Sequence, residues 1–135
     1  MKKESQKILV VDDHVMMHRT LEKVLKSQNF EFIGAFDAVS AIAKAADEAP
    51  DLILLDLRLP DIDGQQVARS LKTDPKTQNI PIIFITATLS KKDDKVDKHV
   101  VVDGITYLAF AKPLYYPKLI SVIKKTIAAQ GQESP

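Results

Sequence analysis

Polar side chains that can do chemistry follow several short apolar runs of the sequence. The first run ends in two adjacent carboxylates, Asp12 and Asp13, and a later run ends at Asp56. Two further runs lead to a hydroxyl at Thr86 and an ammonium group at Lys112. Like charges held close together repel and raise each other's proton affinity. If these residues meet, their three carboxylates therefore need a cation.

The types of these side chains favour a site for a metal ion and a phosphate. Carboxylate oxygens suit a hard cation such as Mg²⁺, and a hydroxyl and an ammonium group donate to an anion beside it. An aspartate in this setting can act as a nucleophile toward phosphorus and form an acyl phosphate. Taken singly, each acid is more simply a turn or capping residue. The combination is what favours the site.

The apolar runs alternate with segments of helical period. Strands are predicted at Lys7–Val11, Glu31–Phe36, Leu52–Asp56, Ile82–Thr86 and Ile105–Phe110. Helices are predicted at Val15–Ser27, from Asp37 through Glu48, at Gln65–Lys72, in a segment carrying Val96 and Val100, and from Pro117 onward. Alternation of this kind predicts a parallel sheet with helices on both faces. The carboxyl ends of the strands then form the edge where ligands bind.

One segment allows two interpretations. Ser90 and Asp93 form a capping pattern for the helix that carries Val96 and Val100. The β-branched run from Val100 to Val102 favours a strand as much as a helix.

Composition indicates one ordinary globular domain. The chain has 135 residues, 45% of them apolar and 27% charged, with a formal net charge of +1. This balance gives no argument for direct binding to nucleic acid or to a membrane. There is no cysteine, no long apolar run and no signal peptide, so a cytoplasmic location is expected. We expect a domain at residues 7–129 between flexible ends at 1–6 and 130–135.

Four sequence stretches occur in the order of a known family. They are ILVVDD, LILLDLRLPDIDG, IPIIFITA and the late AKP, and together they span nearly the whole chain. With them the chain resembles the receiver domain of two-component response regulators. The resemblance implies an α/β, flavodoxin-like (βα)5 fold with a five-stranded parallel sheet in the order 2-1-3-4-5.

The resemblance implies a role for each acidic residue. Asp56 matches the aspartate that accepts phosphate from the phosphohistidine of a sensor histidine kinase or phosphotransfer protein. Asp12 and Asp13 match the acidic pair that holds Mg²⁺ together with Asp56, with Asp13 as the direct ligand. The backbone carbonyl of Arg58 matches the remaining protein ligand.

Further positions match the switch of the family. Thr86 matches the hydroxyl that reaches a phosphoryl oxygen, and Lys112 matches the lysine that pairs with the same phosphate. The Lys112-Pro113 bond is usually cis in this family. Gly64 stands where the family turns tightly into its third helix.

The chain also departs from the family pattern. Receivers carry Tyr or Phe three residues before the lysine, and here that residue is Ala109, with Tyr107 and Phe110 close by. The departure leaves open a receiver-like interaction domain that does not need phosphate. A phosphohydrolase with an aspartyl nucleophile is a further alternative, although it usually has a second acid where this chain has Arg58. The downstream protein is unknown, and a homodimer is left open.

Two histidines lie four residues apart on the first predicted helix. The spacing of His14 and His18 suits a metal, but the sequence offers no evident third ligand. We therefore interpret both as residues of a solvated helix face. His99 is flanked by charge and is given no role.

Overall fold

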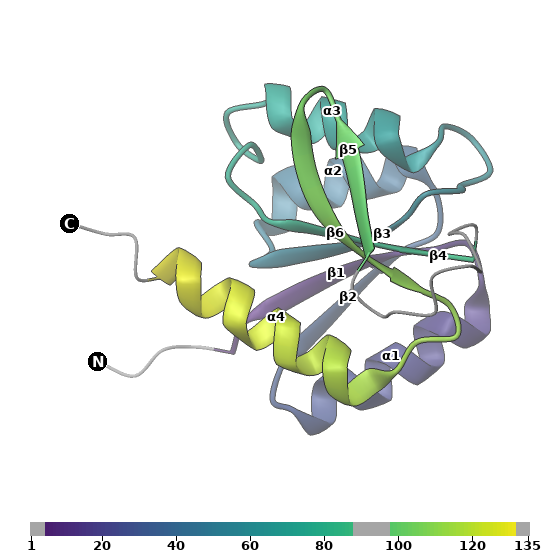
Figure 1. The fold of residues 1–135 in the computed structure, drawn as a ribbon, viewed down its shortest axis with the longest axis vertical. Coiled ribbons are helices and arrows are strands. Elements are labelled where there is room, and N and C mark those ends of the chain that lie inside the picture. Colours follow the sequence, from purple (N-terminus) through teal and green to yellow (C-terminus); the bar gives the residue numbers. More distant parts are fainter. Residues whose placement is uncertain (1–4, 88–97, 132–135) are drawn as a thin grey trace.

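The computed structural model describes residues 5–87 and 98–131, which form one sheet and four helices (Figure 1). The strands are β1 (Lys7–Val11), β2 (Glu31–Ala35), β3 (Leu52–Asp56), β4 (Ile82–Thr86), β5 (Lys98–Val102) and β6 (Ile105–Ala111). The helices are α1 (Val15–Ser27), α2 (Ala38–Glu48), α3 (Gly64–Thr73) and α4 (Tyr116–Gly131). None of these described helices is long and apolar enough to cross a membrane.

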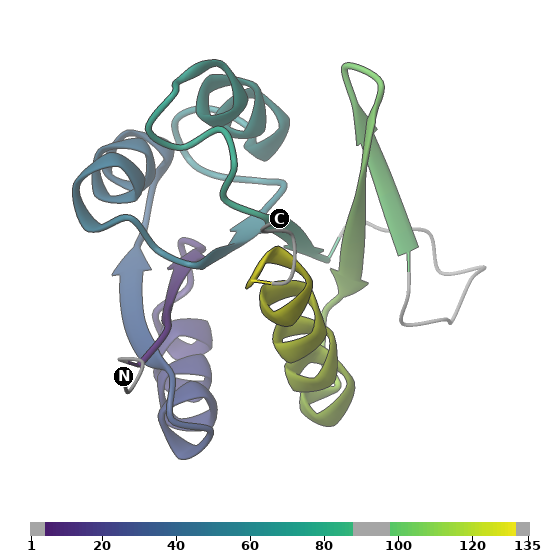
Figure 2. The same cartoon turned by 90° about the vertical axis from the view of Figure 1, so that its left-hand side faces the viewer.

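The sheet has the order β2-β1-β3-β4-β6-β5. Its first five members run parallel, and β5 pairs with β6 in the antiparallel direction. Figure 2 shows α2 and α3 on one side of the sheet and α1 and α4 on the other. The class is therefore α/β and flavodoxin-like, as predicted, and the predicted fifth strand is β6.

Burial explains why the central strands are apolar up to their last residues, Asp56 and Thr86. Every residue of β3 and β4 is buried, because helices cover both faces of the sheet. Alternate residues of β1 enter different cores: Ile8 and Val10 pack with α1 and α4, whereas Leu9 and Val11 pack with α2 and α3. The less apolar β2 forms one edge of the sheet. A rigid, doubly covered sheet thus supports the strand ends.

The segment before the last strand differs from the predicted helix. Val100 lies in β5, and Ser90, Asp93 and Val96 lie outside the described residues. A two-residue turn joins β5 to β6, with φ of 51° at Asp103 and 82° at Gly104. Two positive φ values are the requirement of a type I′ turn, which Asp-Gly satisfies readily. The sheet of the described residues therefore has six strands in place of five.

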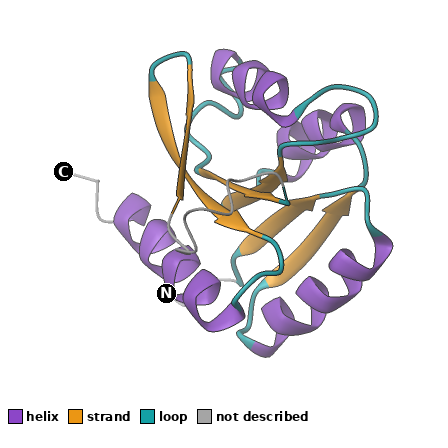
Figure 3. Ribbon diagram, turned by 45° about the vertical axis from the view of Figure 1, so that its right-hand side comes forward, coloured by secondary structure: helices purple, strands orange, loops and turns teal. Residues whose placement is uncertain are grey.

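The β5–β6 hairpin packs on the side of the sheet that carries α3 (Figure 3). Tyr107 of β6 is buried, and its ring lies nearly perpendicular to that of Phe84, with 5.4 Å between ring centroids. Val102 is also buried, and Arg69 of α3 forms an ion pair with Asp103 at 3.0 Å. The hairpin thus closes the core on this side of the sheet. The predicted domain limits at residues 7 and 129 stay predictions.

Candidate functional site

The carboxyl ends of β1, β3, β4 and β6 meet at one edge of the sheet. Because these strands are parallel neighbours, the residues that follow them lie side by side. A pocket of about 210 Å³ opens there. The predicted residues that line it are Asp13, Asp56, Arg58, Thr86 and Lys112.

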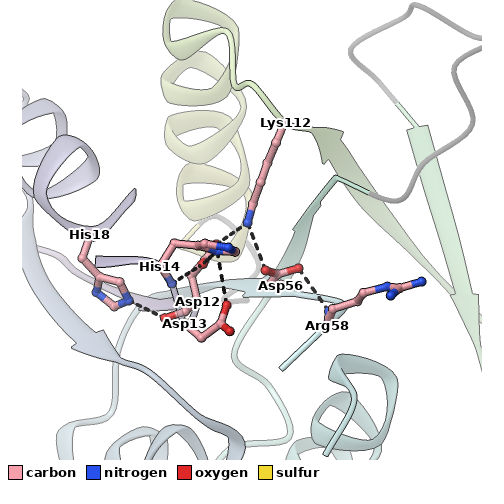
Figure 4. Close-up of polar contacts among 7 residues, drawn as sticks. All are labelled: Asp12, Asp13, His14, His18, Asp56, Arg58 and Lys112. Carbon is pink, nitrogen blue, oxygen red and sulfur yellow. Dashed lines mark hydrogen bonds and ion pairs between the residues drawn. The ribbon is translucent and has the colours of Figure 1, made fainter. Parts of the chain in front are cut away.

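Lys112 makes the central contact of the site (Figure 4). Its Nζ lies 2.6 Å from Oδ2 of Asp12 and donates to Oδ2 of Asp56 at 3.0 Å. Both carboxylates are buried, whereas the side chain of Asp13 is 40% exposed. The backbone N–H of Lys112 also donates to the carbonyl of Thr86, which aligns the two strand ends. The single ammonium group of Lys112 therefore forms ion pairs with two buried carboxylates.

The two buried carboxyl groups have opposite pKa shifts. Burial raises the pKa of Asp56, and hydrogen bonds from the Arg58 N–H and from Lys112 only partly oppose it. Burial also acts to raise the pKa of Asp12, but hydrogen bonds from Lys112 and His14 outweigh it and lower the pKa. Burial acts to lower the pKa of Lys112, but its two carboxylate partners raise it overall. Of the two buried carboxylates, Asp56 is thus the one whose negative charge its neighbours compensate less.

The backbone that follows β3 fixes the position of Asp56. The N–H of Arg58 donates to Oδ1 of Asp56 at 3.1 Å, and the N–H of Gly64 donates to the carbonyl of Leu57 at 2.7 Å. A Cβ atom at Gly64 would lie 2.3 Å from the carbonyl oxygen of Asp56. Only glycine therefore allows α3 to begin so close to this strand. The role of the Arg58 carbonyl as a ligand stays a prediction.

The register of β6 decides which residues stand beside Thr86. Thr86 is buried and pairs with Ala111, whereas Ala109 pairs with Phe84. Tyr107 lies on the same side of the sheet as Ala109 and packs against Phe84, and Phe110 enters the opposite core. Of the two aromatic residues near the family position, Tyr107 is thus held in the core under the hairpin and Phe110 in the core on the other side of the sheet. As predicted for the switch region, the Lys112-Pro113 bond is cis.

His18 was missed as a residue of the site. It is buried, and its Nε2 donates to the backbone carbonyl of Asp12 at 2.7 Å. Its ring stacks on Phe36 at 4.0 Å, and a Cβ atom at Gly34 would come within 2.7 Å of Nδ1. The prediction that His18 belongs to a solvated helix face is wrong. Sequence spacing gave no sign of this contact, because it depends on how α1 packs against β2.

His14 lies at the mouth of the site. Its Nδ1 is 2.8 Å from Oδ1 of Asp12 and 3.2 Å from Oδ1 of Asp13 (Figure 4). The ring is 68% exposed, so it belongs to the surface as predicted, yet it turns toward the acids. One ligand atom from each of Asp12, Asp13, His14 and Asp56 lies within 4.8 Å of the others. Among the described residues, the groups close enough to share an ion with His14 are therefore the neighbouring aspartates, not His18.

The donor set fits a divalent cation. The three carboxylates outnumber the two cationic side chains of the pocket, Lys112 and Arg58, so the pocket carries excess negative charge. Oxygen donors from carboxylates are those that Mg²⁺ takes, and it keeps several waters when few protein ligands bind it. Asp12, Asp13 and Asp56 have the type and the proximity for such a site.

Comparison with known proteins agrees with this geometry. Residues 8–124 match the family described as the response regulator receiver domain. The response regulator PleD of Caulobacter vibrioides is 45% identical over 92 residues, which are 68% of this chain and 20% of PleD. The polar-differentiation response regulator DivK of Brucella anthropi is 28% identical over 87% of this chain and 92% of its own. The chain thus spans about a fifth of one relative and most of the other.

Solved structures share the fold as well. One is the receiver domain of the sensor histidine kinase PA1611 from Pseudomonas aeruginosa, which has a magnesium ion coordinated in its active site cleft. It is 26% identical to this chain, with a TM-score of 0.78 over 92% of this chain and 98% of its own. The family match over most of the sequence, together with the acids at the strand ends, shows that this chain belongs to the receiver domains of response regulators.

Proposed function

We propose that this chain accepts a phosphoryl group on Asp56 and acts as a switch in a two-component phosphorelay. The observation that carries the proposal is the convergence of three carboxylates and Lys112 at the edge of the sheet. Membership of the receiver family supports the same function. The donor would be the phosphohistidine of a sensor histidine kinase or of a phosphotransfer protein.

Transfer to Asp56 forms one bond and breaks one. An oxygen of the Asp56 carboxylate attacks phosphorus, and the bond from phosphorus to the donor imidazole nitrogen breaks. The imidazole leaves with the electron pair of that bond. The N–H of Arg58 already holds Oδ1 of Asp56, and Lys112 already contacts Oδ2. Transfer of this kind needs little from a protein beyond positioning and charge neutralisation.

The acids at the end of β1 would hold Mg²⁺ in this reaction. Asp13 and Asp56 would supply direct oxygen ligands, and Asp12 and the carbonyl of Arg58 would complete the protein contribution. Bound Mg²⁺ would neutralise charge on the phosphoryl oxygens. The relative PA1611 has magnesium in its active site cleft, which supports a metal at this place.

Phosphorylation would then change what the domain binds. A phosphoryl group on Asp56 offers new acceptor oxygens to Lys112, directly after β6, and to the hydroxyl of Thr86, at the end of β4. Movement of these two groups toward the phosphate would shift a two-state equilibrium toward a form that binds another protein. The chain would modify itself and would not turn over a foreign substrate. A cytoplasmic location, where such donors act, stays a prediction.

Phosphate incorporation from a small donor tests the proposal. The protein is incubated with acetyl phosphate and Mg²⁺, and intact-protein mass spectrometry follows the reaction. We expect one added phosphoryl group in the native chain and none in Asp56→Asn. Asp51→Asn is a matched control, because Asp51 precedes the same strand at its opposite end, and it should be phosphorylated like the native chain.

Three results would contradict the proposal. Labelling of Asp56→Asn would assign the phosphate to another residue. Steady release of phosphate from simple esters, lost in Asp56→Asn, would favour an aspartyl phosphohydrolase. Failure of the native chain to accept phosphate or to bind beryllofluoride would favour an interaction domain that works without phosphate.

A further inference from the structure

We propose that His14 is a nitrogen ligand of the metal held by Asp13 and Asp56, so that the site prefers late first-row divalent cations to Mg²⁺. This inference rests on the proposed function, because it assumes a metal among these acids. The inference adds a nitrogen ligand to the oxygen ligands of the site, and this ligand changes which divalent ion the site prefers.

The imidazole is already at ligand distance from its neighbours. Its Nδ1 lies 2.8 Å and 3.2 Å from oxygens of Asp12 and Asp13. Adjacent ligands of one octahedral ion, each about 2.1 Å from the metal, lie about 3 Å apart, and opposite ligands lie about 4.2 Å apart. The four ligand atoms, which include one of Asp56, lie within 4.8 Å of one another. Small side-chain rotations would bring them around one ion.

The direction of the ring is not explained by the helix that follows it. His14 is the residue before α1, a place where a side chain often caps the first turn, but its ring makes no capping hydrogen bond. Its backbone N–H instead donates to Oδ1 of Asp12 at 2.9 Å, which bends the chain back toward the acids. With 68% of the side chain exposed, packing does little to hold the ring there. A hydrogen bond between Nδ1 and Oδ1 of Asp12 at 2.8 Å turns the ring toward the acidic site, and metal binding at Nδ1 would replace this hydrogen bond.

A nitrogen donor changes the preference of the site. Imidazole suits ions such as Co²⁺, Ni²⁺ and Zn²⁺, whereas carboxylate, carbonyl and water suit Mg²⁺. Affinity at mixed nitrogen and oxygen sites rises from Mn²⁺ to Cu²⁺ along the first row. Mg²⁺ would still bind through the carboxylates, because it needs few protein ligands. Removal of His14 should therefore weaken Co²⁺ binding far more than Mg²⁺ binding.

Calorimetric titrations with Co²⁺ and with Mg²⁺ test the inference on the full chain. In His14→Ala we expect the Co²⁺ affinity to fall by about tenfold or more, since even outer partners of metal ligands are worth about 10- to 100-fold. The Mg²⁺ affinity should change by less than about threefold. His14→Gln, which keeps a polar side chain without the ring, should behave like His14→Ala. His99→Ala is the matched control, because His99 is exposed on β5 and outside the cluster.

A second readout identifies the donor atom. The visible absorption of bound Co²⁺ depends on its ligands, so the native spectrum should change in His14→Ala and stay unchanged in His99→Ala. An unchanged ratio of Co²⁺ to Mg²⁺ affinity in both His14 variants would overturn the inference.

The variant Asp13→Asn separates this failure from failure of the proposed function. If Asp13→Asn loses Mg²⁺ binding but the His14 variants keep the native ion preference, only the role of His14 is wrong. If Asp13→Asn keeps native affinity for both ions, the metal site itself is wrong, and the metal-dependent function falls with it.

Discussion

At the scale of single residues, two buried aspartates share one lysine but are not equivalent. Asp12 receives hydrogen bonds from Lys112 and from the backbone and ring of His14, and together these lower its pKa. Asp56 receives fewer compensating contacts, so burial prevails and its pKa is raised. The folded chain therefore resists ionisation of the residue that we propose as phosphoacceptor. A bound divalent cation would remove that resistance.

This difference predicts that Asp56→Asn stabilises the metal-free protein at neutral pH. A raised folded pKa means that stability is fully present below the ordinary value of 3.8 and is lost as pH rises through the folded pKa. Asparagine carries no charge and escapes that loss. We expect a melting temperature higher by a few degrees at neutral pH, the effect of about 1 kcal/mol in a domain of this length. The difference should shrink toward pH 4 or below.

Thermal unfolding followed by circular dichroism in a chelator, at neutral and acidic pH, makes the measurement. If Asp56→Asn were less stable than the native chain at neutral pH, the prediction of a raised pKa for Asp56 would be contradicted. A difference between the two proteins that does not depend on pH would contradict it as well.

At the scale of elements, the start of α3 sets the position of Asp56. Gly64 lies so close to β3 that an added Cβ would overlap the Asp56 carbonyl and approach the Cα of Leu57 at 2.9 Å. These neighbours are backbone atoms, which cannot rotate away as a flexible side chain can. The helix start and the proposed phosphoacceptor therefore move together.

We expect Gly64→Ala to destabilise the protein by about 2 to 3 kcal/mol through this overlap. It should also slow phosphorylation by acetyl phosphate, because the end of β3 must shift. Gly104→Ala is the control: its φ is 82° and nothing lies within 4 Å of the added atom. Backbone strain there should cost about 1 kcal/mol without changing phosphorylation. Urea unfolding measures the first effect, and equal phosphorylation rates in the two variants would contradict the prediction.

The formation of the β5–β6 hairpin is explained by residues within the hairpin itself. Val100, Val101 and Val102 favour extended backbone, and Asp103 with Gly104 supplies the tight turn. Its attachment to the sheet depends on more distant contacts. Only the last residues of β6, from Ala109, pair with β4, so the rest of the hairpin relies on side chains.

Tyr107 is the side chain expected to anchor the hairpin. Tyr107→Ala should destabilise the protein by about 3 kcal/mol, because it removes a buried ring packed on Phe84. Tyr107→Phe keeps the ring and should cost about 1 kcal/mol or less. Urea unfolding distinguishes them. If both variants lose the same stability, the hydroxyl and not the ring matters, and the packing argument is wrong.

At the scale of the whole molecule, the site exists only when the sheet is assembled. Asp12, Asp56 and Lys112 stand at the ends of three strands that are far apart in the sequence but close at one edge of the sheet. The unfolded chain has no equivalent cluster. A cation that binds this cluster therefore stabilises the folded state by mass action.

We expect the melting temperature to rise with Mg²⁺ concentration. At about 100 times the dissociation constant, the added stability should be about 2.7 kcal/mol. In Asp13→Asn the rise should be lost or strongly reduced, because a direct ligand is missing. Differential scanning calorimetry at constant ionic strength separates this from general salt effects. The same rise in both proteins would show that Mg²⁺ acts elsewhere.

The sequence by itself determined the alternation of elements and the place of the acids within it. Continuous apolar runs, helical periodicity and capping residues are local signals, so the ranges of β1, α1, β3 and β4 follow from them directly. The acids, Thr86 and Lys112 could be placed at strand ends for the same reason. Of the two interpretations of the run from Val100 to Val102, the strand is confirmed and the helix is wrong at Val100, because Asp103 and Gly104 form a tight turn that pairs this run with β6.

Only the tertiary structure decided how these parts meet. It buried His18 under Asp12, turned His14 toward the carboxylates and shared Lys112 between Asp12 and Asp56. It also placed Tyr107 in the hairpin core. Each of these outcomes depends on contacts between elements that are separated in the chain or on the rotation of a side chain. Residue spacing carries no information on such distances, because they are set by the packing of helices and strands against one sheet.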